Sequence, residues 1–155
     1  LYDAPARYLF ECEYKGGVTM TVANTSDMPP EFKQAAGDRL GTQFIARDGE
    51  WIYVDRGEFR ASNEELLKLT VKDSDFRFRS EGNHMRDFLN CVKSRQDPAA
   101  PVNAGHRSAS IGHLGKIACE LGATLHWDPK TETFAKEPSL NGLLTRKYRG
   151  DWKLG

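Results

Sequence analysis

Two short segments place a histidine and an arginine at the expected start of a helix. The first is Asn83-His84-Met85-Arg86 and the second is Gly105-His106-Arg107-Ser108. Unpaired backbone N–H groups at a helix N-terminus attract anions and hydroxyl-rich ligands, and cationic side chains strengthen that attraction. The candidate ligand-binding residues are therefore His84, Arg86, His106 and Arg107. The competing interpretation is that these side chains cap their helices or pair with acidic residues on neighbouring elements.

The sequence gives less support to a metal site or to nucleophilic catalysis. His106 and His113 share a helical face, but seven residues of helix separate them by about 10.5 Å, too far to share one metal ion. Ser108 and Ser110 lie near His106, yet helical residues two apart point in different directions. The sequence contains neither His-Glu-x-x-His nor Gly-x-Ser-x-Gly. We therefore assign no catalytic residue and no metal ligand, and an autonomous metal hydrolase stays open only as an alternative that requires bound zinc.

A dinucleotide site is also missing from the sequence. Such a site needs a strand, then Gly-x-Gly-x-x-Gly, then a helix, so that the pyrophosphate meets backbone N–H groups. The nearest run, Gly112-His113-Leu114-Gly115, falls inside a helical pattern, and Gly115-Lys116 continues into Ile117. We therefore expect no cofactor-binding residue in this chain.

The composition is that of a globular domain. The 155 residues are 39% hydrophobic and 28% charged, with 22 basic and 22 acidic side chains. Zero net charge argues against nucleic-acid binding, which needs a basic surface, and no apolar run approaches the roughly 20 residues of a membrane span. The three cysteines lie far apart, as expected of reduced thiols in the cytoplasm, although export stays possible. Because the chain starts with Leu1, we expect a further segment upstream.

The first half of the chain has the alternating pattern of strands. Arg7–Tyr14 and Val18–Thr25 flank Lys15-Gly16-Gly17, a hairpin signal. A second hairpin is predicted around Asp48-Gly49, and Phe59 is placed in a fifth strand. The predicted second hairpin joins Thr42–Arg47 to Glu50–Asp55. The stretch 27–41 contains two prolines and is predicted to be a loop.

The second half has helical periodicity. Ser62 is the predicted cap of a short helix, with Glu65 completing a capping box. A helix over 83–95 carries the apolar stripe Met85, Phe88, Leu89 and Val92, and another spans 105–121. In the latter, a row of small residues predicts close contact with another backbone. That row is Gly105, Ser108, Gly112, Gly115 and Cys119. A short strand over 124–127, a turn at 128–130 and a short helix over 139–144 complete the prediction.

Strands followed by helices, without βαβ alternation, predict an α+β fold. We expect an open antiparallel or mixed sheet with helices packed on one face. A moderately apolar outer face bearing Leu9, Thr19 and Thr21 suits a sheet-to-sheet contact between copies. The alternative is a one-sided sheet with a few exposed aromatic side chains, which is common.

Several segments, taken in order, resemble the C-terminal domain of the Gfo/Idh/MocA oxidoreductases (glucose–fructose oxidoreductase, inositol dehydrogenase, rhizopine catabolism), in the bacterial branch with a long C-terminal extension. They are Asn83–Arg95, Pro101–Ala118, Leu125-His126-Trp127-Asp128-Pro129 and Tyr148-Arg149-Gly150-Asp151-Trp152. The resemblance implies a fold like the C-terminal domain of glyceraldehyde-3-phosphate dehydrogenase. It also implies a parent enzyme whose N-terminal Rossmann domain binds NAD or NADP.

The resemblance further implies that residues 1–155 form one domain that shapes the substrate pocket and the oligomer interface. The implied substrates are sugars, cyclitols and their derivatives. The family's catalytic Glu-Lys-Pro and Asp-x-x-x-His motifs do not occur, and Lys136-Glu137-Pro138 has the wrong order. We therefore expect a partial enzyme that needs its Rossmann domain. The alternative is a stand-alone carbohydrate-binding or oligomerisation module without activity.

Overall fold

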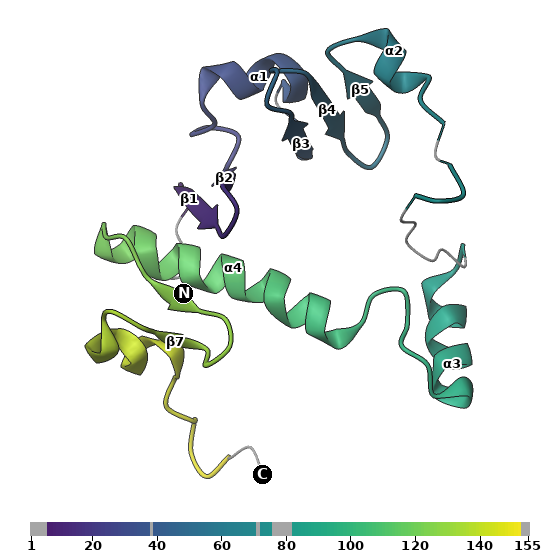
Figure 1. Cartoon of the computed structure of the whole chain (residues 1–155). Helices are drawn as coiled ribbons and strands as arrows, with labels where there is room; N and C mark the ends of the chain where they lie inside the picture. The colour runs from purple at the N-terminus through teal and green to yellow at the C-terminus, as the bar shows by residue number, and fades with distance from the viewer. Residues whose placement is uncertain (1–5, 38, 71, 76–81, 153–155) are drawn as a thin grey trace.

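The computed structural model of this chain describes residues 6–37, 39–70, 72–75 and 82–152. Within them the structure forms three small sheets, β1-β2, β3-β4-β5 and β6-β7, in which every strand pair is antiparallel (Figure 1). The elements are β1 (Leu9–Tyr14), β2 (Val18–Ala23), α1 (Pro30–Ala36), β3 (Thr42–Ile45), β4 (Trp51–Val54), β5 (Phe59–Ala61), α2 (Glu64–Leu67), α3 (His84–Ser94), α4 (Val102–Leu121), β6 (Trp127–Asp128), β7 (Thr133–Phe134) and the 3-10 helix η1 (Pro138–Leu144). The predicted α+β class is confirmed.

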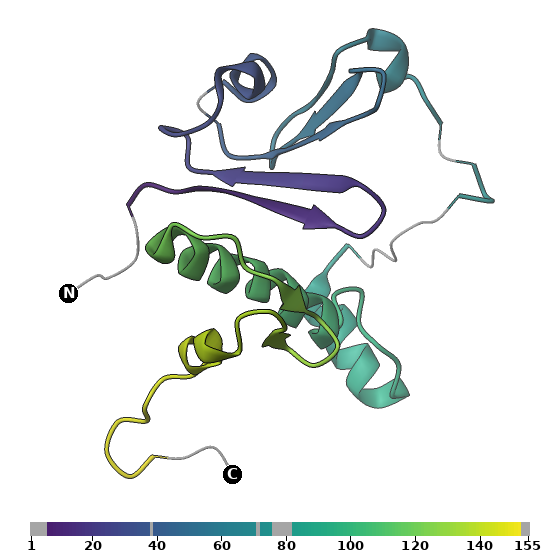
Figure 2. The same cartoon turned by 60° about the vertical axis from the view of Figure 1, so that its left-hand side comes forward.

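The first hairpin forms where the sequence predicts it. Gly16 and Gly17 adopt φ of 101° and 80°, the left-handed backbone that this turn requires. Phe10 lies opposite Val22 in the register, so the alternating apolar side chains of β1 and β2 share one face. That face is turned toward α4, and β1-β2 lies between α4 and the β3-β4-β5 sheet in Figure 2.

The second hairpin is also confirmed, with shorter strands than predicted. Gly49 has a φ of 87°, and the turn is closed by a hydrogen bond from Ala46 N to Glu50 O of 2.8 Å. The predicted fifth strand forms as β5, which contains Phe59 and pairs with β4.

The predicted loop at 27–41 was wrong, because α1 occupies its centre. Pro30 stands at the start of this helix, where its fixed φ fits and its missing N–H costs nothing. Ala35 and Ala36 are buried against Tyr53 of β4, with Met28 and Trp51 packed around them. The small side chains let the helix approach the sheet, and this contact stabilises a segment whose sequence alone favours a loop.

Helix α4 packs on the first hairpin. The ring of Phe10 lies so close to Gly115 that a Cβ added there would be 2.3 Å from Cζ of that ring. One turn further on, Cys119 Sγ lies 3.7 Å from the carbonyl oxygen of Leu9. The predicted close contact along the row of small residues is therefore found at its C-terminal end. Gly105 and Gly112 face open space, so the N-terminal part of that prediction was wrong.

The two helices before α4 differ from the prediction in detail. Asn63, not Ser62, caps α2, since its side chain accepts a 2.9 Å hydrogen bond from Glu65 N. Ser62 Oγ instead accepts a hydrogen bond from Trp51 N. Helix α3 has the predicted bounds, but its buried residues are Asp87 and Cys91 rather than its apolar stripe.

The C-terminal segment folds back along α4. The predicted strand at 124–127 shifts to β6 and pairs with β7, with Trp127 opposite Phe134. Phe134 is buried, and its backbone N–H donates to Asn141 Oδ1 of the predicted short helix, which forms as η1. The predicted turn at 128–130 is confirmed by the 2.8 Å hydrogen bond from Lys130 N to Asp128 Oδ1.

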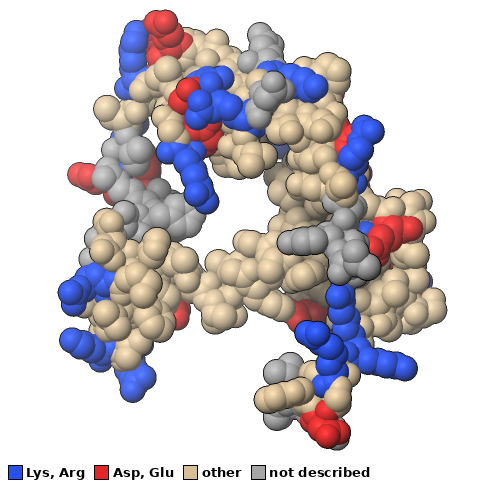
Figure 3. Space-filling model, turned by 180° about the vertical axis from the view of Figure 1, so that it is seen from behind, with Lys and Arg blue, Asp and Glu red and all other residues tan. Residues whose placement is uncertain are grey.

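The molecule as a whole is open. It exposes 13465 Å², whereas a compact monomer of this mass exposes about 7,900 Å². Figure 3 shows the same openness as a hollow between the upper sheet region and the helices below. No helix in the described part of the chain is both long and apolar enough to cross a membrane.

Candidate functional site

The first candidate pair lies at the start of α3. His84 is the first residue of the helix, and Asn83 caps it by accepting a 3.0 Å hydrogen bond from Arg86 N. The side chains of His84 and Arg86 are both exposed. Both side chains are therefore accessible to a ligand.

The second candidate pair, His106 and Arg107, was predicted to lie at a helix N-terminus, but the structure places it further inside the helix. Because α4 begins at Val102, His106 and Arg107 lie in its second turn, beyond the four unpaired N–H groups. His106 Nε2 instead lies 2.6 Å from Glu132 Oε1, in the turn between β6 and β7. This is the pairing with a neighbouring acidic residue that the competing interpretation predicts for His106. Arg107 is exposed.

The contact with Glu132 uses only one of the two ring nitrogens of His106, namely Nε2. An ionised carboxylate only accepts hydrogen bonds, so Nε2 is the donor in this contact. In the uncharged tautomer that the contact selects, Nδ1 keeps a lone pair. The side chains of His106 and Glu132 are 56% and 54% exposed, which leaves Nδ1 within reach of a ligand hydroxyl. Glu132 has a φ of 53°, which is uncommon for a residue with a side chain.

The two candidate pairs do not form one site in this structure. Within residues 82–152, no hydrogen bond or ion pair joins His84 or Arg86 to His106 or Arg107. The loop 95–101 separates α3 from α4, and only the second pair lies beside the β6-β7 turn.

A second histidine–carboxylate pair was missed by the sequence analysis. His126 Nδ1 lies 2.6 Å from Glu137 Oε1, and the His126 backbone N–H donates to Glu137 Oε2 at 3.2 Å. Both oxygens of Glu137 thus hold one residue, and the pair connects the base of the β6-β7 hairpin to the start of η1. The signal that could have revealed it is the predicted turn at 128–130, which brings the chain back past His126.

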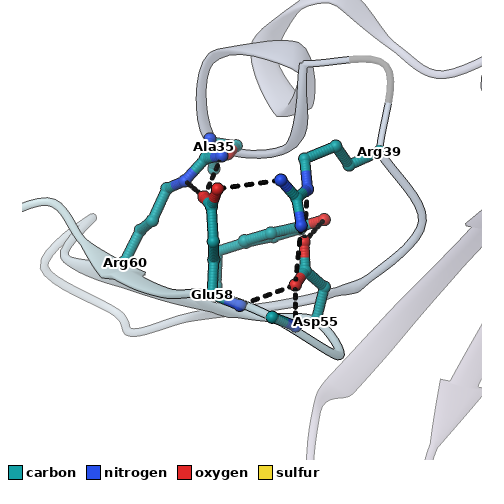
Figure 4. A network of polar contacts seen from close by, with 7 residues as sticks. Ala35, Arg39, Asp55, Glu58 and Arg60 are labelled. Atoms are coloured by element: carbon teal, nitrogen blue, oxygen red, sulfur yellow. Dashed lines mark hydrogen bonds and ion pairs between the residues drawn. The ribbon is translucent and has the colours of Figure 1, made fainter.

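A polar network beside α1 was also missed (Figure 4). Arg39 donates from Nε to Asp55 Oδ2 at 2.7 Å and from Nη1 to Glu58 Oε1 at 2.8 Å. Glu58 also pairs with Arg60, and Arg60 Nη1 donates to Ala35 O of α1 at 3.0 Å. These contacts fasten α1 to the sheet, so we interpret the network as structural.

Asp55 is the centre of that network. Hydrogen bonds from the backbone N–H of Gly57, which has the largest effect, and from the Arg39 guanidinium lower the pKa of Asp55 to about 2. Tyr53 donates from its hydroxyl to Asp55 Oδ2 at 3.4 Å. Burial raises the pKa of Tyr53, which therefore stays protonated and acts as a donor.

The described residues do not fit a bound dinucleotide. The shortest strand-to-helix junction in that part of the chain joins β5 to α2, and it carries Glu64 and Glu65 in the first turn, where they would repel a pyrophosphate. Helix α4 follows a loop rather than a strand, and Gly112 and Gly115 lie in its interior. Among the described residues, no group of three or more His, Cys, Asp and Glu side chains is arranged to hold a metal ion.

Comparisons with known proteins identify the family of this chain. Neither the search of curated proteins nor the search of solved structures returned a match. Residues 59–154 match the family described as "Oxidoreductase family, C-terminal alpha/beta domain". The match begins at β5 and includes α3, α4 and the C-terminal hairpin, which carry all four candidate residues. Since it covers more than half of the chain, the chain belongs to the Gfo/Idh/MocA oxidoreductase family, as its C-terminal domain.

Proposed function

We propose that this domain serves an NAD(P)-dependent oxidoreductase that acts on a sugar or cyclitol derivative. The domain contributes substrate contacts and an oligomer interface, and a separate Rossmann domain holds NAD or NADP and supplies the catalytic residues. The family match supports the oxidoreductase assignment. The three free cysteines suit a reducing compartment, and we place the enzyme in the cytoplasm.

The proposed interfaces are supported mainly by the large exposed surface area of this chain. The excess of about 5,600 Å² over a compact monomer is more than one chain loses in most large obligate interfaces, in which the two partners together bury about 2,000–5,000 Å². Much of it is apolar, since Phe44, Ile45 and Phe59 of the β3-β4-β5 sheet are each more than half exposed. Exposed apolar side chains gathered on one sheet support a surface that protein partners cover. We assign it to the Rossmann domain and to a second copy that contacts the sheet.

For substrate contact we favour His106 and Arg107 over His84 and Arg86. His106 offers Nδ1 as an acceptor for a sugar hydroxyl, and Glu132 fixes the ring in that tautomer. Arg107 follows it directly and is exposed, so it suits an anionic or hydroxyl-rich substituent. The pair at the start of α3 is the second candidate.

The test is steady-state kinetics of the full-length protein with NAD and NADP and a panel of sugars and cyclitols. We expect turnover of at least one, and His106→Ala or Arg107→Ala should raise KM or lower kcat by roughly 10-fold, the value of one lost hydrogen bond to substrate. His113→Ala, on the same helix and also exposed, is the matched control and should change neither constant. Unchanged kinetics in both variants would show that His106 and Arg107 are structural.

The alternative is a stand-alone carbohydrate-binding or oligomerisation module. It predicts that a reading frame begins just before Leu1 and that sugar binds without any turnover. A frame that continues upstream into a strand followed by Gly-x-Gly-x-x-Gly would remove this alternative.

A further inference from the structure

Helix α3 turns its apolar stripe to solvent. Its buried residues are Asp87, which is 3% exposed, and Cys91, whereas Met85 and Phe88 of the stripe are 64% and 55% exposed. A 2.8 Å hydrogen bond from Ala99 N holds the Asp87 carboxylate against the loop that follows the helix. An amphipathic helix usually buries its apolar side, whereas α3 leaves its apolar side accessible to an external partner.

Basic side chains border this stripe. At 3.6 residues per turn, Arg86 and Lys93 lie together on one border, about a quarter to a third of a turn from the centre of the stripe. Arg95 follows as the C-cap of the helix, and all three side chains are exposed. The acidic residue of the helix, Asp87, is buried. The exposed charges of α3 and its C-cap are therefore all basic.

The C-terminal tail repeats this combination of basic and apolar side chains. After η1, residues 145–152 are all exposed, and the tail contains Lys147 and Arg149 next to aromatic residues. The side chains of Tyr148 and Trp152 are 55% and 82% exposed. In Figures 1 and 2, the tail and α3 both lie on the side of the molecule away from the β3-β4-β5 sheet. One side of the domain thus presents exposed apolar groups beside basic ones.

The charge of the whole chain is divided in the same sense. Residues 1–75 contain 9 basic and 14 acidic side chains, whereas residues 76–155, which include α3 and the tail, contain 13 basic and 8 acidic ones. Figure 3 shows basic side chains gathered at the corner that α3 occupies. The zero net charge therefore hides a positive half, which would be attracted to a negatively charged surface.

We propose that α3 docks on an anionic phospholipid bilayer, with its apolar stripe among the headgroups and its basic side chains against their negative charges. A helix of this kind lies in the plane of the interface and buries its apolar face about 5–10 Å into the boundary with the acyl chains. Lys and Arg on the border of the stripe can extend to the headgroups, and the cytoplasmic leaflet is negatively charged.

A bilayer surface offers an apolar and an anionic environment together. A nucleic acid would match the basic charge of α3 but would leave its apolar stripe in water. The exposed Tyr148 and Trp152 of the tail add to the argument, because these two residue types are enriched at membrane–water interfaces. This inference is independent of the proposed substrate and of the residues that contact it.

The experiment is co-sedimentation of the full-length protein with vesicles of phosphatidylcholine, either pure or with about 30% phosphatidylserine. We expect binding to the anionic vesicles that weakens as salt is added, and much weaker binding to the pure ones. Phe88→Asp should weaken binding roughly 30-fold, because a large apolar side chain no longer leaves water. Lys93→Glu should also weaken it roughly 30-fold, since it changes two charges and each contributes about five-fold.

Matched controls make the same chemical changes outside α3 and the tail. Leu40 is 80% exposed and Lys33 of α1 is exposed, so Leu40→Asp and Lys33→Glu should bind like the unmodified protein. Leu89→Asp replaces Phe88→Asp if that variant loses its circular dichroism spectrum. Failure of the unmodified protein to bind anionic vesicles would overturn the proposal and leave an acidic protein as the partner of α3. Binding that Phe88→Asp leaves unchanged would also overturn it, because it would show adsorption by charge without insertion of the stripe.

Discussion

Because α4 packs on the first hairpin, alanine substitutions at two glycines of this helix should change the stability of the protein by different amounts. A Cβ at Gly115 would lie 2.3 Å from Cζ of the Phe10 ring, well inside van der Waals contact. A Cβ at Gly112 would meet nothing within 4 Å. We therefore compare Gly115→Ala with Gly112→Ala, which make the same chemical change three residues apart.

The magnitudes follow from two effects. Alanine is favoured over glycine inside a helix by about 1 kcal/mol, and both variants gain this amount. Forcing a methyl group into a filled contact costs about 1–3 kcal/mol, because the ring or the helix has to shift. Gly112→Ala should therefore raise the free energy of unfolding by about 1 kcal/mol. Gly115→Ala should lie about 1–3 kcal/mol below Gly112→Ala.

The assay is urea denaturation followed by far-ultraviolet circular dichroism, with equal slopes required before the midpoints are compared. The difference between the two variants cancels helix propensity and isolates the contact with Phe10. Equal stabilisation by both substitutions would refute the packing of α4 on β1. Loss of slope in Gly115→Ala alone would instead indicate that the hairpin had detached.

Three further predictions concern the β3-β4-β5 sheet and the helices α1 and α2 beside it. Gly41→Ala should lower the free energy of unfolding by about 1–3 kcal/mol, since its Cβ would lie 2.4 Å from the hydroxyl of buried Tyr53; an unchanged urea midpoint would count against that contact. The folded pKa of Asp55 is about 2, below the unfolded value of about 3.9, so its stabilisation is complete above about pH 4 and disappears as pH falls toward 2. Asp55→Asn should flatten this acid limb in thermal melts, and an unaltered limb would contradict the assignment. Asn63→Ala should cost about 1 kcal/mol as a lost cap of α2, whereas Asn63→Ser, which keeps a side-chain oxygen that can accept from Glu65 N, should retain most of the stability.

Local turn chemistry explains why the hairpins could be predicted. Gly16-Gly17 and Asp48-Gly49 supply the positive φ that a tight turn needs, and the flanking residues alternate with period two. These signals lie within a few residues of each other and do not depend on the rest of the fold. The family resemblance likewise rests on contiguous segments, most of which lie inside the matched range 59–154.

Features that depend on distant contacts could not be predicted. Helix α1 is stabilised by burial of Ala35 and Ala36 against Tyr53, which lies far along the chain. The burial of Asp87 in place of the apolar stripe depends on Ala99 reaching back to it. The periodicity of α3 gave the helix but not the side that it would bury.

In the candidate site too, the local feature could be predicted and the distant contact could not. The periodicity located His106 and Arg107 on a helix, but it placed the helix start three residues too late, because it gives no sign that Pro101 is the N-cap of α4. The partner of His106 could not be found, since Glu132 reaches it only when the β6-β7 hairpin folds back along α4. The chain separation between the two residues hides the pair from any local pattern.

The central proposal is that this domain carries no dinucleotide site and depends on a separate Rossmann domain. Isothermal titration of residues 1–155 with NADH and NADPH tests it most directly, with the full-length protein titrated in parallel. We expect no saturable heat from residues 1–155 and one-site binding by the full-length protein. Saturable, one-to-one binding of either nucleotide to residues 1–155 would contradict the claim.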